Sequence, residues 1–214
     1  MEKISRSMIE YRKAVAGDIE ACAKIYAEGF AAQLRLFFGP RPPVGLLADF
    51  LRLCRRFEND GFIVGHENNR PAGFILITKN HGRLFRRVIA AGIVTATAKS
   101  LFSVYGRMPL FRILASTAEG VTFFRKTSKF EKKANSSAQV VTMNVNSRFH
   151  GQGIGGKLLY FGIEYLKKHD VPALKLEVRT DNTPALHLYE KTGFVTCGEI
   201  KSSVGTSLVM VKRL

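Results

Sequence analysis

The sequence predicts an α/β (α+β) protein with a mixed, mostly antiparallel central sheet flanked by helices. Several segments carry apolar residues at spacings of three and four, the periodicity of helices that pack on a core. Other segments are short, rich in Val, Ile and Phe and bounded by turn residues, which is typical of strands. Turns connect the early strands and helices connect the later ones. Antiparallel and parallel pairs are therefore expected in one sheet.

The first sixty residues predict one strand and two helices. Residues 9–14 form the strand, and a helical stretch opens at Gly17-Asp18. This stretch ends before Gly39-Pro40-Arg41-Pro42-Pro43, because no helix runs through that density of proline. A second amphipathic helix covers residues 46–57, with its arginines outside the apolar stripe.

Two short apolar runs, residues 61–65 and 72–78, predict a hairpin. Glu67-Asn68-Asn69-Arg70-Pro71 between them supplies the turn residues. Residues 80–138 then separate this hairpin from the next strand. A structureless loop of that length is uncommon in a compact domain, so we expect helices in the segment.

The C-terminal part of the chain predicts alternating strands and helices. Its first strand, residues 140–145, places Val141, Met143 and Val145 on one face. A helix marked by Leu159, Ile163 and Leu166 follows, and then a strand over 174–179 in which apolar and polar residues alternate. A short helix comes next, with Pro184 at its first position and Gly193 past its end. Strands over 194–197 and 207–211 complete the chain.

Length, composition and charge bound the class of protein. A chain of 214 residues that is 46% hydrophobic predicts a single folded domain, residues 1–214, with a basic insertion at about 80–138. Lys and Arg number 33 against 17 Asp and Glu, a net charge of +16. Counting Lys79, the insertion holds 12 Lys and Arg residues against Glu119 and Glu131. Such an excess favours an anionic partner, which can be nucleic acid, a phosphate group or a lipid surface.

The cysteines and the apolar segments bear on the cellular compartment in which the protein is expected. Cys22, Cys54 and Cys197 are an odd number at scattered spacings, which fits neither a disulfide framework nor a zinc site, and no metal is expected. Reduced thiols predict a cytoplasmic protein, and we find no secretory signal at the N-terminus. Residues 88–105 are too polar for a membrane span, yet they fit a helix that lies on a membrane surface.

The segment most informative about function, residues 145–159, joins a strand end, a glycine-rich turn and a helix start. Gly151, Gly153, Gly155 and Gly156 remove Cβ atoms, so backbone N–H groups can approach an anion closely. The helix start adds unpaired N–H groups and the positive end of its dipole. These features predict a pyrophosphate cradle. The structural alternative is a tight turn that needs several positive φ angles.

A second segment, residues 176–194, completes a recognisable pattern. Together the two segments resemble the acetyl-CoA-dependent N-acetyltransferase superfamily (GNAT), and the second is most similar to the ribosomal-protein alanine N-acetyltransferases. The family's phosphate motif falls on His150-Gly151-Gln152-Gly153-Ile154-Gly155, and its later pattern falls on Asn182, Ala185, Tyr189 and Gly193-Phe194. The resemblance is close over 140–197, looser over 9–30 and 61–79, and absent over 80–138.

The resemblance implies a GNAT-like fold with a helical insertion, and acetyl-CoA as cosubstrate bound where two parallel strands splay apart. The cofactor-binding residues carried over are Met143, Asn144, Val145, Arg148, His150, Gly151, Gln152, Gly153, Ile154, Gly155, Gly156, Lys157, Asn182 and Ala185. A backbone N–H of the strand before the turn would polarise the acetyl carbonyl. His150 departs from the family's leading Arg or Gln, and Arg148 is placed to supply the lost charge.

The resemblance also implies roles for individual residues, each with a structural alternative. Glu177 is the candidate base that deprotonates the acceptor amine, or else a strand carboxylate that pairs with Lys175 or Arg179. Tyr189 is the candidate acid for the departing CoA thiolate, or else a core tyrosine. Asn182 contacts the cofactor arm, or else caps a helix.

Two classes of function remain open. The favoured one is an acetyltransferase that moves acetyl from acetyl-CoA to a primary amine of a small molecule or peptide, through a ternary complex. The alternative is a non-catalytic basic protein that binds nucleic acid or an anionic membrane, although the motifs disfavour nucleic acid as a partner. For the basic segment 83–112, a lid over the acceptor site, a peripheral membrane contact and a homodimer face are all kept.

Overall fold

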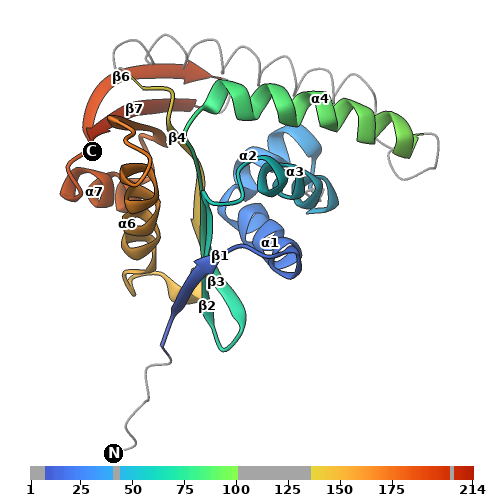
Figure 1. Cartoon of the computed structure of the whole chain (residues 1–214), viewed down its shortest axis with the longest axis horizontal. Helices are drawn as coiled ribbons and strands as arrows, with labels where there is room; N and C mark the ends of the chain where they lie inside the picture. Colours follow the sequence, from blue (N-terminus) through green and yellow to red (C-terminus); the bar gives the residue numbers. More distant parts are fainter. Residues whose placement is uncertain (1–7, 41–43, 101–135, 203–204) are drawn as a thin grey trace, which may run out of the picture.

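A computed structural model describes residues 8–40, 44–100, 136–202 and 205–214 (Figure 1). At its centre is a seven-stranded sheet in the order β1-β2-β3-β4-β5-β7-β6. The strands are β1 (Glu10–Lys13), β2 (Phe62–Glu67), β3 (Arg70–Thr78), β4 (Gln139–Val145), β5 (Ala173–Arg179), β6 (Val195–Ser202) and β7 (Gly205–Arg213). Among these described strands only β4 and β5 pair in parallel. The predicted mixed, mostly antiparallel sheet is confirmed.

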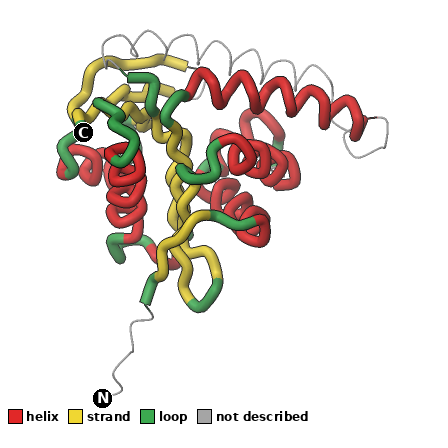
Figure 2. Tube along the Cα trace, viewed as in Figure 1, coloured by secondary structure: helices red, strands yellow, loops and turns green. Residues whose placement is uncertain are grey.

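Helices cover both faces of the sheet, as Figures 1 and 2 show. On one face lie α1 (Ile19–Gly29), α2 (Ala31–Phe38) and α3 (Val44–Phe57), and α4 (His81–Ser100) packs against α3. On the other face lie α6 (Ile154–Lys167) and α7 (Thr183–Lys191). Two short 3₁₀ turns, η1 (Ala16–Asp18) and η2 (Ser147–Phe149), precede α1 and follow β4.

The alternation of side chains along the strands produces two cores. Phe62, Val64, Phe74 and Leu76 point to the α1–α3 face, where they pack with Ile19 and Leu51. Their neighbours along the same strands, such as Ile75 and Ile77, point to the opposite face and pack with Leu158, Leu159 and Leu166 of α6. The sheet is thereby buried on both sides, and it holds the α6–α7 layer and the α1–α3 layer apart.

The hairpin and the last helix differ in detail from the prediction. Glu67, Arg70 and Pro71, predicted as turn residues, belong to strands β2 and β3. The turn is Asn68-Asn69 alone, with φ angles of 48° and 62°. Two positive φ angles suit the twist of a two-residue hairpin, and Asn tolerates them. Pro184 is the second residue of α7, because Thr183 precedes it inside the helix.

The final strands are longer than predicted, extending over Val195–Ser202 and Gly205–Arg213. The added residues are mostly polar or exposed, so they lack the apolar pattern by which a strand is recognised. Helix α4 confirms the expectation of a helix in the insertion over 81–100, and residues 101–135 lie outside the described residues. None of the described helices is long and apolar enough to cross a membrane.

Candidate active site

Strands β4 and β5 separate almost as soon as they meet. They pair only at Gln139 and Lys175, where the Lys175 N–H donates to the carbonyl of Ala138 at 3.0 Å. Beyond this point β5 pairs with β7 along its whole length, and β4 continues to Val145 without a described strand on its other side. An unpaired strand edge presents N–H and C=O groups to any extended ligand that lies along it.

A β-bulge at Val141 changes the direction of the side chains along β4. Leu76 of β3 pairs with Thr142 and Ile77 pairs with Val140, so Val141 has no partner on β3. Val141 packs with the α1–α3 core, whereas Met143 and Val145 pack with the α6 core. The prediction that Val141, Met143 and Val145 share one face is therefore wrong, because the extra residue reverses the alternation. Bulges occur next to active sites, where they redirect side chains.

The glycine-rich turn after β4 adopts a conformation that favours glycine at two positions. Gly151 and Gly153 have φ angles of +76° and +78°, and a Cβ at either would meet nothing within 4 Å. The space beside them is open, as an approaching anion requires. At Gly155 and Gly156 a Cβ would lie 3.5 and 3.6 Å from the Leu188 side chain, so these glycines allow α6 to lie close to α7.

The start of α6 supplies the donors of this turn. Gly153 is the N-cap of α6, so Ile154, Gly155 and Gly156 occupy its first turn. N–H groups of a first turn have no acceptor within the helix, and they carry the positive end of its dipole. Open space, positive φ angles and free donors together fit the diphosphate of a CoA molecule. Lys157, exposed in the same first turns, adds a positive charge.

The polar residues before the turn are arranged differently from a simple row of phosphate ligands. His150 Nε2 lies 3.0 Å from the Val145 carbonyl oxygen, which can only accept, so Nε2 carries the hydrogen. Only Nδ1 of the ring is left to face an anion. Arg148 is exposed and lines a separate cavity of about 610 Å³ together with Arg70 of the hairpin. Gln152 directs its amide to the Arg148 carbonyl at 3.4 Å.

Glu177 lies on β5, on the same face as Lys175. Its Oε1 accepts a hydrogen bond of 3.0 Å from Nε2 of Gln139, the β4 residue at the single pairing position. Burial raises the pKa of Glu177 to about 7, opposed by the charge of Lys175 and by the hydrogen bond from Gln139. Arg179, the other expected ion-pair partner, instead binds Asp181. A carboxyl group with a pKa near neutrality matches what a general base requires.

Tyr189 lies on α7, with its ring packed against Phe194 at 5.7 Å between centroids. Burial raises the pKa of its hydroxyl to about 12, so the group is protonated at neutral pH. The hydroxyl makes no hydrogen bond to the described part of the chain, and its proton can be donated to a ligand. Asn182 is the N-cap of α7: its Oδ1 accepts from the Ala185 N–H at 3.3 Å, leaving Nδ2 available.

Asn144 points away from the glycine turn. Its Oδ1 would lie 2.5 Å from a Cβ added at Gly29, which places the side chain against the end of α1. Its Nδ2 donates to Thr142 Oγ1 at 2.6 Å. Any contact from Asn144 to a ligand at the α6 face must therefore come from its backbone.

Sequence reasoning missed Gln139 and the surroundings of Lys175. Gln139 is 5% exposed, and its Oε1 has no hydrogen-bond partner in the described part of the chain. Lys175 is fully buried, and the pKa of His81 is lowered to about 4 by burial of its ring and by the charge of Lys175. The only sequence signal was a polar residue at the start of an apolar strand, which does not reveal its partner on β5.

Comparison with known proteins bears on the same part of the chain. Residues 118–194 match the model of the acetyltransferase (GNAT) family. A mycothiol acetyltransferase from Corynebacterium glutamicum is 34% identical over 56 residues, which are 26% of this chain and 19% of that protein. A candidate [ribosomal protein bS18]-alanine N-acetyltransferase from Bacillus subtilis is 38% identical over 56 residues, 26% of this chain and 37% of that protein.

The fold matches solved acetyltransferase structures over nearly the whole chain. The structure of yncA from Salmonella typhimurium with acetyl-CoA superposes with a TM-score of 0.59 at 13% identity, covering 96% of this chain and 93% of that one. In contrast, the sequence match covers only about a fifth of the mycothiol acetyltransferase. The match to the family model begins within residues 80–138, where the sequence motifs gave no resemblance, and it includes β4, the glycine turn, α6, β5 and α7.

Proposed function

We propose that the chain is an acetyltransferase of the GNAT family, whose model matches residues 118–194, and that it moves the acetyl group of acetyl-CoA to a primary amine by direct attack in a ternary complex. One observation carries this proposal. The unpaired edge of β4 runs directly into a glycine turn and a helix start, with β5 diverging beside it. An extended arm and a diphosphate can therefore be held by consecutive parts of one segment.

The backbone does most of the binding in this proposal. The N–H groups at the start of α6 hold the diphosphate, with Lys157 and His150 at the rim of the turn. The pantetheine arm lies along Met143, Asn144 and Val145 as an added strand. The Nδ2 group of Asn182, which capping leaves available, donates to the same arm from the side of α7.

Glu177 is proposed as the base. Acetyl-CoA, when bound, supplies the thioester carbonyl that the amine attacks. The acceptor arrives as an ammonium ion and must lose a proton before it is nucleophilic. Glu177 lies on β5 where the two strands begin to diverge, and a pKa of about 7 lets its carboxylate take that proton directly or through one water.

Tyr189 is proposed as the acid. Its ring is fixed by the α6–α7 core, and its phenol keeps its proton at neutral pH. It gives this proton to the sulfur as the carbon–sulfur bond breaks. Glu177 alternates on β5 with Leu176 and Val178, which pack in the same core as Tyr189, so its side chain leaves the opposite face of the sheet. Base and acid therefore approach the carbonyl from different directions.

The acceptor is proposed to be a primary amine of a peptide or small molecule that enters from the face of α1 and α3. The relatives reported above are named as a mycothiol acetyltransferase and as an N-acetyltransferase for an alanine of a ribosomal protein. These names support both a small molecule and a protein as possible kinds of acceptor. On this face lie Glu177, Gln139 and the side chain of Asn144.

The test is an acetylation assay joined to a binding measurement. Acetyl-CoA should bind in calorimetry, and thiol should be released in the presence of peptides with a free N-terminal amine or of amino sugars, with the acetylated product identified by mass spectrometry. Peptides with a blocked N-terminus and no lysine serve as the control. Absence of acetyl-CoA binding would reject the proposal.

A further inference from the structure

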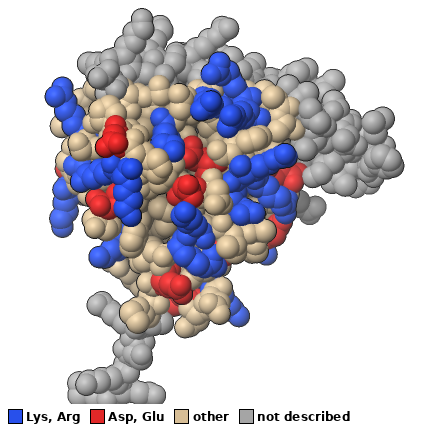
Figure 3. Space-filling view, in the orientation of Figure 1, with Lys and Arg blue, Asp and Glu red and all other residues tan. Residues whose placement is uncertain are grey.

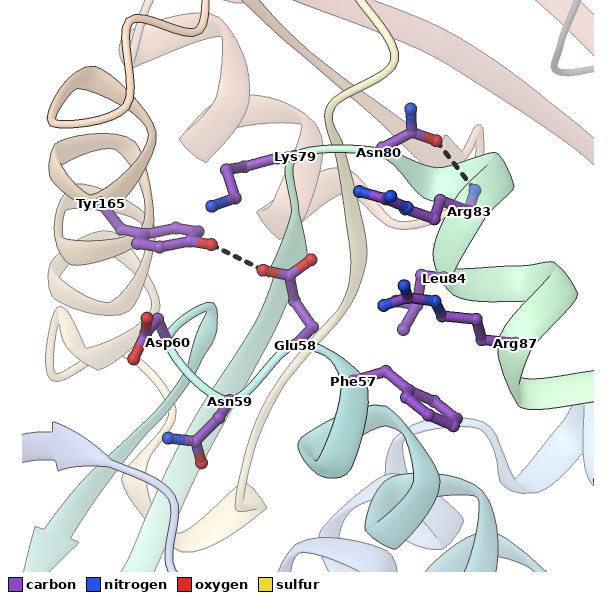
Figure 4. A pocket seen from close by; sticks show the side chains of 10 residues that line it. All are labelled: Phe57, Glu58, Asn59, Asp60, Lys79, Asn80, Arg83, Leu84, Arg87 and Tyr165. Carbon is purple, nitrogen blue, oxygen red and sulfur yellow. Dashed lines mark hydrogen bonds between the residues drawn. The ribbon is translucent and has the colours of Figure 1, made fainter. Parts of the chain in front are cut away.

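A second cavity lies outside the acetyl-transfer region, at the other end of β4 from the glycine turn. Its volume is about 260 Å³, and Figure 4 shows that its walls come from the end of α3, the connection from β3 to α4, the first turns of α4, and α6. We call it the arginine pocket. It is lined by Phe57, Glu58, Asn59, Asp60, Lys79, Asn80, Arg83, Leu84, Arg87 and Tyr165.

Both carboxylates of the arginine pocket have partners of their own. Glu58 Oε1 accepts a hydrogen bond of 2.6 Å from the Tyr165 hydroxyl, and Oε2 accepts one of 2.5 Å from Thr78. Burial and the Glu58 carboxylate raise the pKa of Tyr165, which keeps this donor protonated. Asp60 forms an ion pair of 2.6 Å with Lys13 outside the pocket.

The three cations of the arginine pocket have no such partners. Lys79, Arg83 and Arg87 form no ion pair within the described part of the chain. Lys79 Nζ lies 5.6 Å from the centre of the Tyr165 ring, and Arg87 Cζ lies 5.9 Å from that of Phe57. These ring contacts orient the side chains without neutralising them, and the charge of Lys79 also helps to lower the pKa of the neighbouring Asp60. In Figure 4 both guanidinium groups reach from α4 towards the cavity, and Lys79 enters from the end of β3.

The positions of these cations oppose the stability of α4. Arg83 is in the first turn of the helix, where the dipole already contributes positive charge. Arg87 follows four residues later on the same side, and like charges at that spacing destabilise a helix. Figure 3 shows Lys and Arg spread over one face of the molecule, with Asp and Glu among them. An anion in the pocket would relieve all of these repulsions at once.

We propose that the arginine pocket binds a phosphate group. Two arginine forks and one lysine suit an oxyanion that carries more than one charge and several acceptor oxygens. The volume is below the range of about 300–1,000 Å³ that holds drug-sized ligands, which favours a single head group over a whole nucleotide. The phosphate can come from a soluble phosphorylated molecule or from a phospholipid head group.

The first test titrates inorganic phosphate, and then pyrophosphate, into the ¹⁵N-labelled chain at low ionic strength. The amides of residues 58–60 and 79–87 should shift together and saturate. Signals of the glycine turn report separately on any phosphate bound there, so failure of the acetyl-CoA proposal would not be confused with failure of this one. Unchanged signals over 79–87 at about 10 mM phosphate, weaker than a millimolar interaction, would overturn the proposal.

Variants with matched charge separate a pocket from diffuse attraction. The double variant Arg83→Gln/Arg87→Gln should weaken phosphate binding at least tenfold in calorimetry. The control Arg35→Gln/Arg86→Gln removes two exposed charges outside the pocket and should leave the affinity within about twofold. Equal losses of phosphate affinity in the two double variants would overturn the proposal. Arg83→Gln alone, which keeps the contact of Arg87 with Phe57, guards against a folding defect in the double.

Vesicles identify the source of the phosphate. Phosphatidylglycerol mixed with phosphatidylcholine is compared with phosphatidylcholine alone in a sedimentation assay. If the unaltered chain and the control variant Arg35→Gln/Arg86→Gln sediment with the anionic vesicles but Arg83→Gln/Arg87→Gln does not, the ligand is a lipid head group. Phosphate binding in solution without retention on vesicles supports a soluble ligand. If Arg83→Gln/Arg87→Gln still sediments with the vesicles and binds phosphate with unchanged affinity, the pocket has no role in binding.

Discussion

The glycine turn, residues 150–156, and the arginine pocket are the two regions proposed to bind anions, and they would do so with different groups. The glycine turn presents backbone N–H groups at the start of α6, next to open space beside Gly151 and Gly153. The arginine pocket presents charged side chains around a small cavity. Backbone donors are fixed by the fold and hold their charge at every pH. The attraction of an anion to exposed cationic side chains is screened by salt.

The two regions also differ in what surrounds the anion. At the glycine turn, the edge of β4 continues away from the anion and can guide a long ligand towards Glu177 and Tyr189. At the arginine pocket, Glu58 and Tyr165 close the cavity on one side. The first region can therefore serve a substrate that reacts at a distance from its phosphates, whereas the second serves attachment. Each prediction below should alter one region and leave the other unchanged.

The largest effect is expected for Tyr189→Phe. The change removes the hydroxyl and keeps the ring packed against Phe194. Turnover should fall by roughly 10²–10⁴, the usual contribution of a positioned acid. Acetyl-CoA affinity and phosphate binding at the arginine pocket should stay as in the unaltered chain. Tyr160→Phe, an exposed tyrosine on α6, is the control. Full turnover in Tyr189→Phe with chemistry rate-limiting would remove Tyr189 from the mechanism.

A second prediction concerns stability and pH. The native state keeps the Glu177 proton up to a pH of about 7, whereas the unfolded chain releases it near 4.5, the ordinary pKa of a glutamate carboxyl. The unfolded state is therefore favoured increasingly as pH rises between these values. Glu177→Gln should remove this loss and raise the free energy of unfolding at pH 8 by about 1–3 kcal/mol.

The measurement is denaturant unfolding of both chains from pH 4 to pH 8. The stability difference should grow across the window between pH 4.5 and 7 and level off above it. Glu164→Gln, a carboxylate on the surface of α6 that lies 3.6 Å from Lys167, is the control and should show no such growth. A difference that is constant with pH would show that Glu177 has the same pKa in the folded and the unfolded chain.

The third prediction separates the two anion-binding regions directly. Gly153→Val adds a branched side chain at a φ of +78°, in the space left for the diphosphate. Acetyl-CoA affinity should fall at least tenfold, about 1.4 kcal/mol, while phosphate still shifts residues 79–87. Gly205→Val imposes a similar strain in the hairpin of β6 and β7, where φ is +113°, and should leave both affinities unchanged. An unaltered acetyl-CoA affinity in Gly153→Val would reject the cradle.

The glycine turn could be predicted from the sequence because its parts are consecutive. The strand end, the glycines and the helix start all fall within residues 145–159, so the sequence located the turn, and the structure confirms the arrangement of strand, turn and helix. That the turn holds a pyrophosphate stays a prediction. The arginine pocket draws on three segments that are far apart, at residues 57–60, 79–87 and 165. No spacing rule joins Tyr165 to Glu58. For the basic segment that includes the start of α4, the sequence left a lid, a membrane contact and a dimer face open.

The strands of the sheet were predictable, and its irregularities were not. Periodicity located every strand of the described chain, since burial of one or both faces produces an apolar pattern. The bulge at Val141 leaves no such pattern, because it depends on how β3 and β4 align. The hydrogen bond from Gln139 to Glu177 likewise depends on the register of two strands, and it joins residues 38 positions apart in sequence.

The smallest effect is expected for Gln139→Leu. The amide of Gln139 donates to Glu177 and so stabilises the charged carboxylate, and its removal should move the pKa of Glu177 upwards. The acidic limb of kcat/KM should shift to higher pH, with a loss of roughly two- to tenfold at pH 7 from one net hydrogen bond. A ¹³C titration of the Glu177 carboxyl measures the pKa without the acceptor. Leucine removes the unpartnered Gln139 Oε1 but also leaves Glu177 Oε1 without its donor, so the free energy of unfolding should fall by about 1 kcal/mol where Glu177 is charged. A Glu177 titration that does not move would show that Gln139 packs beside the base without positioning it, and the acetyl-transfer region would then depend on β5 alone to set its base.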